Sequence, residues 1–317
     1  MVALSVQIEI AGGLSWPRWK RIVAEVDRLG YRGLYCCDHF YPSGSGYVDA
    51  VEIGLAFGYL ADHSARLEFG ALVSPVSFRD PVWLARDALA LDNLSGGRFI
   101  LGVGAGWMER EHVGFGYELG DRKTRMARLS EALKVIDLLT RREGPVSHSG
   151  RFYHLQDAVL LPQSPRPGGP RLMIGGAGPL RTPPLTAKYA DIWNVGPRAP
   201  EAFRESSDLL SDLLVKAERQ PGDVRRTQMI QIICYRGSDL APRVRHLLAE
   251  MPGLDAAAAL AAQRARSPHT IVGTPAEVID RIGAHAAAGV EEIMVQRFDL
   301  DDMEGVAIIA EDVLPKV

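Results

Sequence analysis

The sequence predicts an α/β fold: a single closed parallel (β/α)8 barrel with loop insertions at its C-terminal face, spanning residues 1–317 as one domain. Three observations lead to this prediction. Short apolar runs alternate with amphipathic helical patterns eight times along the chain. The length of 317 residues suits a barrel of about 250 residues with insertions. Glycine-rich stretches follow the fourth and fifth apolar runs, as is common where loops meet at a barrel rim.

The expected strands are short apolar runs, each followed by a turn or a helix start. In chain order they cover residues 3–10, 33–37, 67–73, 98–103, 171–175, 191–195, 227–235 and 291–296. Because helical patterns separate neighbouring strands, we expect the strands to run parallel and to close into a barrel.

The expected helices are identified by their apolar spacing and their caps. Ser15 caps the first helix and Gly30 stops it, while Asp80 caps the third. Thr274 and Glu277 form a capping box at the start of a late helix. The helical patterns cover residues 15–29, 48–62, 80–95, 122–139, 179–190 and 201–219, two alanine-rich stretches before residue 290, and residues 302–313.

The Pro- and Gly-rich stretch LPQSPRPGGP, residues 161–170, has the composition of a linker between two domains. Strand–helix alternation resumes unchanged beyond it, so we interpret it as a loop between the fourth helix and the fifth strand. The chain is accordingly expected to form a single domain.

Composition and charge exclude several classes of function. The 36 basic residues nearly balance the 39 acidic ones and are interspersed with them, which argues against nucleic-acid binding. No apolar run reaches the length of a membrane span, and the first residues lack the basic region of a signal peptide. The three cysteines, Cys36, Cys37 and Cys234, form neither a disulfide framework nor a spaced metal-binding pair. We therefore expect a cytoplasmic protein without a metal site.

Two stretches, FILGVGAGW (99–107) and RLMIGGAGPL (171–180), place glycines directly after an apolar strand. A doubly wound dinucleotide fold requires G-x-G-x-x-G at its first strand–helix turn, but here G-x-G-x-G follows the fourth strand. In a barrel, both stretches lie at the C-terminal rim and border one pocket. The second is the stronger phosphate site, because uncovered N–H groups precede a helix start near Pro179. Ordinary tight turns are the alternative for both.

Five stretches of the chain carry a family resemblance. In chain order they are YCCDHF, the segment from LVSPVSFRDP to ILGVGAGW, GRFYHLQDAVLLPQSPRP, IGGAGPLRTPPLTAKYADIWN and IVGTPAEVIDRIGAHAAAGVEEIMVQ. Together they resemble the bacterial luciferase-like superfamily, and within it the branch that uses the deazaflavin coenzyme F420. The resemblance covers nearly the whole chain. It implies a TIM barrel whose cofactor lies across the C-terminal mouth, and it leaves the substrate open.

The resemblance also implies which residues hold the cofactor. The run at 175–178 matches the loop that grips its phosphate-bearing side chain. A bulge with a non-prolyl cis peptide, which supports the ring in this family, matches Ala71–Leu72. The implied cofactor-binding residues are Asp38, Ala71, Leu72, Ser74, Gly104, Gly106, Gly175, Gly176, Ala177 and Gly178. We therefore expect the segments ending near positions 38, 72, 106 and 176 to surround one cavity.

Asp38 and His39, at the end of the second strand, are the expected catalytic pair. A histidine exchanges protons near neutral pH, and a neighbouring carboxylate can fix its orientation or charge. In F420-using relatives the matching Asp contacts the cofactor and the matching His serves in acid–base work. Flavin-using relatives more often carry Glu-His-His here, so the resemblance favours F420 over FMN. A capping Asp beside a surface His is the structural alternative.

The expected substrate pocket contains Trp107, Glu111 and Trp193. Members of the branch that oxidise sugar phosphates carry Glu where this chain has Trp107, so we expect an apolar or aromatic wall and no phosphorylated sugar. For Glu111 the alternative is a solvated loop or a salt bridge, and for Trp193 it is core packing.

The sequence thus predicts an oxidoreductase that transfers a hydride between F420 and an unidentified organic substrate. His39 would handle the accompanying proton, and Asp38 would position the cofactor or that imidazole. The alternative on the same scaffold is an FMN-dependent monooxygenase that uses reduced flavin and oxygen. A cofactor-binding protein without turnover is a further alternative, whereas a lyase or aldolase lacks a pocket lysine. Relatives often form dimers, which implies a homodimer whose interface the sequence does not locate.

Overall fold

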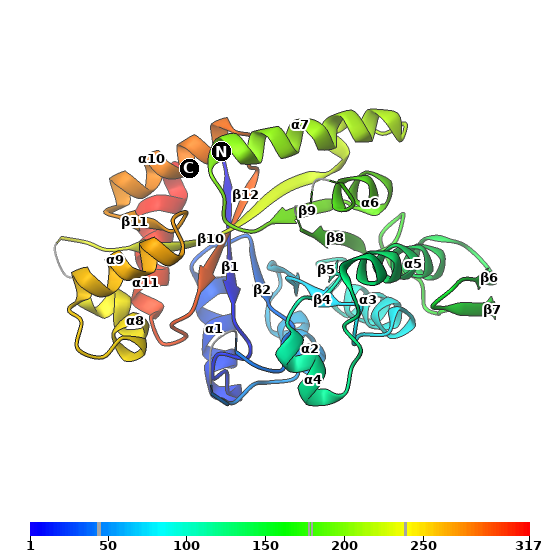
Figure 1. Ribbon diagram of the computed structural model, residues 1–317, viewed down its shortest axis with the longest axis horizontal. Coiled ribbons are helices and arrows are strands. Elements are labelled where there is room, and N and C mark those ends of the chain that lie inside the picture. The colour runs from blue at the N-terminus through cyan, green and yellow to red at the C-terminus, as the bar shows by residue number, and fades with distance from the viewer. Residues whose placement is uncertain (43–45, 177, 179, 238–239) are drawn as a thin grey trace.

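The computed structural model describes residues 1–42, 46–176, 178, 180–237 and 240–317 (Figure 1). Within these residues, parallel strands close into an eight-stranded barrel, which confirms the predicted fold class. In order around the barrel, the strands are β1 (Ala3–Ile8), β2 (Gly33–Cys36), β3 (Glu68–Ala71), β5 (Phe99–Gly104), β8 (Arg171–Gly175), β9 (Ile192–Val195), β10 (Arg225–Cys234) and β12 (Glu292–Arg297). Pairing of β12 with β1 closes the ring.

Helices surround the barrel (Figure 1). Those that follow the barrel strands are α1 (Trp16–Arg28), α2 (Ile53–His63), α3 (Pro81–Ser95), α5 (Arg122–Arg141), α6 (Thr182–Tyr189), α7 (Pro200–Lys216), α10 (Pro275–Ala287) and α11 (Met303–Ile308). Ser15 and Asp80 are the N-caps of α1 and α3, and Thr274 and Glu277 form the predicted capping box of α10. After α11 the chain continues as a π-helical turn at Ile309–Val313 and a 3-10 helical turn at Leu314–Lys316.

Several elements lie outside the regular alternation. They are β4 (Ser74–Pro75), α4 (Glu109–Phe115), the hairpin β6 (Val146–Ser149) and β7 (His154–Ala158), short turns at Pro221–Asp223 and Ala241–Val244, α8 (Arg245–Glu250), the alanine-rich α9 (Ala256–Arg266) and β11 (Ile271–Gly273). The hairpin and the α8–α9 insertion lie at opposite ends of the molecule's longest axis (Figure 1). Helix α4 occupies a segment that the sequence pattern left irregular, and α6 begins at Thr182, after the expected start.

The interior of the barrel is layered. At its N-terminal end, Arg225 donates to Glu68 at 2.8 Å and lies 3.3 Å from a carboxylate oxygen of the fully buried Glu292. Burial disfavours the ionised form of Glu68, but the hydrogen bond from Arg32 and the charges of nearby arginines hold its pKa at about 2. The next layer is apolar and contains Tyr35, Ile100, Met173, Ile192 and Met294. The barrel is therefore filled below its C-terminal mouth.

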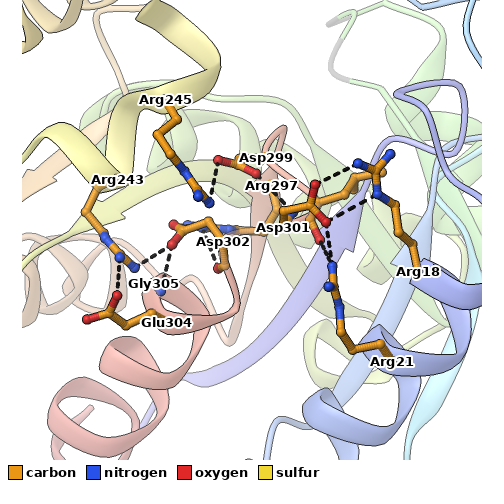
Figure 2. Close-up of polar contacts among 11 residues, drawn as sticks. Arg18, Arg21, Arg243, Arg245, Arg297, Asp299, Asp301, Asp302, Glu304 and Gly305 are labelled. Atoms are coloured by element: carbon orange, nitrogen blue, oxygen red, sulfur yellow. Dashed lines mark hydrogen bonds and ion pairs between the residues drawn. The ribbon is translucent and has the colours of Figure 1, made fainter.

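An ion network at the C-terminal end of β12 ties the α8–α9 insertion and α1 to the barrel (Figure 2). The buried Asp302 accepts hydrogen bonds from Arg243 and Arg297, and also from the N–H of Gly305 at 3.1 Å. The adjacent Asp301 lies more openly between two arginines of α1. The loop after β12 is thus fixed from both sides.

Replacing Asp302 by asparagine is expected to lower the free energy of unfolding by about 3 kcal/mol, because the buried Arg297 loses its carboxylate and the buried Arg243 keeps only the exposed Glu304. Urea unfolding measures the change. Asp299→Asn is the matched control: Asp299 pairs with the exposed Arg245 at 3.4 Å, so its loss should cost less than about 1 kcal/mol. Equal losses for the two variants would contradict this account of the network.

No helix in the described part of the chain combines the length and the apolar character that crossing a membrane would require.

Candidate active site

The carboxyl ends of β2, β3, β5, β8 and β9 surround one cavity of about 490 Å³. This volume lies in the range of small-molecule and cofactor sites. Eight of the predicted site residues line the cavity: His39, Leu72, Gly104, Gly106, Trp107, Gly175, Gly176 and Gly178. Segments that are far apart in the sequence therefore meet at the barrel mouth, as expected. The predicted Ala177 lies outside the described residues.

The bulge after the third strand lies on one wall of the cavity. The non-prolyl cis peptide is Leu72–Val73, one residue later than the predicted Ala71–Leu72. Val73 lines the cavity and packs against two of the predicted glycines. A Cβ built on Gly104 would lie 2.6 Å from a methyl carbon of Val73, and one on Gly175 would lie 2.9 Å away. Glycine at these two positions therefore makes room for Val73.

The loop after β8 was expected to offer its backbone N–H groups to a phosphate, but the N–H of Gly176 is already used within the protein. Gly176 has a φ of +125°, which strongly favours glycine. Its N–H donates to the carbonyl of Asn194 at 2.9 Å, and its carbonyl accepts from the indole of Trp193 at 2.9 Å. The backbone of Gly176 is thus already satisfied within the protein. An anion bound here would therefore need other hydrogen-bond donors in the same wall, above all the side chain of Arg122 from α5.

Arg122, the first residue of α5, lines the cavity next to this loop. A Cβ built on Gly178 would lie 3.2 Å from its terminal nitrogen. Among the described residues, nothing forms a hydrogen bond or ion pair with Arg122. A cation in the first turn of a helix is disfavoured by the helix dipole, so an anionic ligand would compensate for its position. The sequence analysis missed this residue, although the Arg122-Lys123 pair at a helix start is a visible anomaly.

His39 is held from behind by a buried carboxylate. Its Nδ1 lies 3.1 Å from each oxygen of Glu111, which also accepts from the N–H of Phe40 at 3.1 Å. Glu111 is almost fully buried and belongs to α4. Burial disfavours the charged imidazole, but the hydrogen bond and the negative charge of Glu111 outweigh it and raise the pKa of His39. Because Nδ1 is engaged with Glu111, Nε2 is the nitrogen left for chemistry in the cavity.

Replacing Glu111 by glutamine is expected to lower the pKa of His39, since the carboxylate that stabilises the imidazolium disappears. Any activity that needs the protonated imidazole would then decline at lower pH than in the unchanged protein. A histidine titration followed by NMR measures the shift. Glu109→Gln, in the same helix, serves as the control. An unchanged His39 titration in the Glu111 variant would contradict the proposed pairing.

Asp38 influences His39 through its negative charge, which contributes to the raised pKa of the imidazole, and not through a hydrogen bond. Its carboxylate accepts from Ser74 Oγ at 2.6 Å and from two nitrogens of Arg79 at 3.0 and 2.8 Å, and it makes no hydrogen bond to His39. Neither Asp38, Ser74 nor Ala71 is among the residues that line the cavity. The two adjacent side chains therefore have different partners, Ser74 and Arg79 for Asp38 and Glu111 for His39. Asp38 instead fastens the bulge between β3 and β4.

Of the three expected substrate-pocket residues, only Trp107 lines the cavity, whereas Glu111 and Trp193 are buried outside it. Trp107 lines the cavity, is largely exposed, and contacts the His39 ring edge-to-face with centroids 5.6 Å apart. Glu111 lies behind His39, as described above. Trp193 is fully buried against Phe203 outside the barrel, which corrects its assignment to the pocket. The next residue on β9, Asn194, lines the cavity in its place because strand side chains alternate.

The sequence analysis also missed the apolar wall of the cavity. Its members are Val73, Pro75, Met126, Leu129 and Met229. Met126 and Leu129 lie in the helical pattern predicted at 122–139, and the apolar spacing of a helix does not distinguish a core face from a pocket wall. In the described part of the chain, no three His, Cys, Asp or Glu side chains gather in a way that would hold a metal ion.

A family model described as luciferase-like monooxygenase matches residues 2–292. The chain belongs to this family. Among curated luciferase-like relatives, an F420-dependent glucose-6-phosphate dehydrogenase of Amycolatopsis mediterranei is 26% identical over 318 residues, covering 92% of this chain and 91% of that protein. The 4-hydroxyprotoasukamycin monooxygenase of Streptomyces nodosus subsp. asukaensis is 32% identical over 165 residues, but the match spans only 43% of its length.

Solved structures of an F420-dependent dehydrogenase and of a monooxygenase share the fold of this luciferase-like chain. An F420-dependent secondary alcohol dehydrogenase in complex with an F420-acetone adduct superposes with a TM-score of 0.79 at 18% identity, covering 98% of each chain. The monooxygenase RslO1 from Streptomyces bottropensis superposes with a TM-score of 0.81, also at 18% identity, covering 99% of each chain. These structures show the shared fold, and the curated relatives include both an F420-dependent dehydrogenase and a monooxygenase.

Proposed function

We propose that this chain is an F420-dependent oxidoreductase that transfers a hydride between the deazaflavin and a small organic substrate. When bound, the deazaflavin supplies a carbon that gives or takes a hydride and that reacts poorly with oxygen. The observation that carries the proposal is the placement of His39 at a cavity of cofactor size, with Nδ1 engaged by Glu111. The Asp-His pair after β2, typical of F420-using relatives, favours this cofactor over FMN.

The residues present fit a flat ring with an anionic tail. Val73, Met126 and Met229 offer an apolar wall for a ring. Arg122, beside Gly178, offers a guanidinium to a phosphate, which it binds with charge-assisted hydrogen bonds. In this proposal the apolar wall orients the ring, and Arg122 holds the tail.

His39 acts as the proton-handling group in this proposal. Glu111 fixes the imidazole so that Nε2 remains to give a proton to the substrate or to take one from it. Trp107 lies edge-to-face against the imidazole, with ring centroids 5.6 Å apart. An exposed tryptophan at this position favours an apolar or aromatic substrate over a phosphorylated sugar. Asp38 contributes indirectly, by fixing the bulge through Ser74 and Arg79.

An FMN-dependent monooxygenase is the second candidate, supported by the similarity to RslO1 and by the partial match to 4-hydroxyprotoasukamycin monooxygenase. The cavity's apolar wall and Arg122 suit either cofactor. Titrating the purified protein with F420 and with FMN separates the candidates. We expect the tighter binding for F420. Tight FMN binding without affinity for F420 would overturn the first proposal, and binding without turnover would favour a storage or sensing protein.

Three further properties stay predictions of the sequence analysis: a single domain over residues 1–317, a homodimer, and a cytoplasmic location. Light scattering of the purified protein tests the second of these.

A further inference from the structure

The far side of the barrel mouth is lined by polar side chains that the cavity described above does not use. On β1, Gln7 pairs in register with Tyr35 of β2, and Tyr35 belongs to the apolar layer inside the barrel. Gln7 therefore points inward. Glu9 follows the end of β1 on the mouth side, and its carboxylate lies on the same side as Gln7, 3.2 Å from Gln7 Nε2. On β12, Gln296 is in register with Gln7 and faces the same space.

Glu9 is a carboxylate without a cation. Gln7 Nε2 and Gln296 Nε2 both donate to its Oε1, each at 3.2 Å. Among the described residues, no N–H or O–H group donates to Oε2, and no Lys, Arg or His forms an ion pair with Glu9. The residue is only partly buried. Oε1 is thus oriented by two neutral amides, and the neutral thiol of Cys37 is the other hydrogen-bonding neighbour of the carboxylate.

Two other carboxylates of the barrel, Glu68 and Asp38, have their negative charge balanced by arginines. Glu68 pairs with Arg225 and Arg32, and Asp38 pairs with Arg79. A carboxylate that served only the fold would gain more from such a cation than from two amides. The exception at Glu9 is located where barrel strands present residues to ligands.

Glu9 lies next to the proposed proton-handling group. It is beyond Ile8, which pairs in register with Cys36 of β2, and His39 follows on the same strand end. Burial raises the pKa of Cys37, and the charge of Glu9 and its hydrogen bond with this thiol raise it further. Burial lowers the pKa of His39, but Glu111 and, after it, the charge of Glu9 raise it. A molecule in contact with His39 therefore lies within the electrostatic influence of Glu9.

We propose that Glu9 determines substrate class by accepting a hydrogen bond from a hydroxyl or protonated amino group of the substrate, and that it disfavours anionic substrates. The inference rests on the proposed function, because it takes the mouth to be the substrate side of the cofactor cavity. It narrows the substrate to a small, uncharged or cationic molecule with an N–H or O–H donor near its reacting end. Gln7 and Gln296 orient the carboxylate and are positioning residues.

The test uses three probes with one carbon skeleton: benzylamine, benzyl alcohol and benzoate. Each is titrated calorimetrically into the protein as purified and into the protein loaded with F420. Benzylamine is expected to bind at least tenfold more tightly than benzoate. Glu9→Gln should weaken benzylamine at least fivefold without weakening benzoate, and Glu9→Asp, which keeps the charge, should restore most of the preference. Glu143→Gln, an exposed carboxylate elsewhere, is the matched control and should change nothing.

Two results would overturn the inference: benzoate binding as tightly as benzylamine, or an unchanged preference in Glu9→Gln. A parallel fall in F420 affinity in Glu9→Gln would also overturn it, because Glu9 would then belong to the cofactor site or to the fold. If F420 does not bind at all, the proposed function fails, while the titrations of the protein as purified still decide the role of Glu9.

Discussion

Replacing His39 by alanine is expected to reduce F420-dependent turnover at least a hundredfold. A positioned general acid or base contributes about 10²–10⁴ in rate, and His39 is the histidine that lines the cavity. F420 affinity should stay within about threefold, because Arg122 and the apolar wall are unaffected. Absorbance of the deazaflavin follows its reduction or oxidation with a panel of small alcohols and carbonyl compounds, and fluorescence of the bound cofactor gives its affinity.

His63→Ala is the control for this prediction. His63 is exposed at the end of α2 and stacks on Tyr59, far from the cavity lining. Its loss should leave turnover unchanged. Turnover that survives in His39→Ala at the level of the control would show that another group moves the proton. A collapse of both turnover and F420 affinity would mean that His39 supports the site structurally.

Replacing Arg122 by alanine is expected to weaken cofactor binding ten- to a hundredfold. A charge-assisted hydrogen bond is worth about 1.5–3 kcal/mol, which corresponds to that range. The affinity of the unchanged protein should fall as salt rises, and the variant should lose much of this dependence. Fluorescence titration of F420 at two salt concentrations measures both effects.

Lys123→Ala provides a matched control, because Lys123 is the adjacent cation on the same helix but does not line the cavity. It should change cofactor affinity less than about threefold. If Arg122→Ala binds the cofactor as tightly as the control, the anionic tail lies elsewhere and the fit of the cavity must be reconsidered.

The barrel could be predicted from the sequence because its pattern is repetitive. Each apolar strand, helix stripe and cap is a local feature, and the capping box at Thr274 and Glu277 forms as expected. The hairpin β6–β7 and the short helix α4 were missed, since their strands and turns are brief and half-exposed and so carry little periodicity.

The site was harder to predict because side-chain partners come from distant segments. Glu111 lies 72 positions from His39 in sequence, and nothing local connects them. The assignment of Trp193 to the pocket was an error that a local rule could have prevented: neighbouring strand residues point to opposite sides, so Trp193 and Asn194 of β9 face apart. Gly104 and Gly175 were expected as cofactor contacts. The structure gives a further reason for glycine at these positions, because a larger residue would collide with the side chain of Val73.

The central claim is that one cavity at the barrel mouth holds a deazaflavin opposite His39. A crystal structure of the protein soaked with F420 tests it most directly. We predict the ring against Val73, with its reactive carbon facing His39 and its phosphate within hydrogen-bond distance of Arg122. Density for the cofactor outside this cavity, or a ring whose reactive carbon faces away from His39, would contradict the claim.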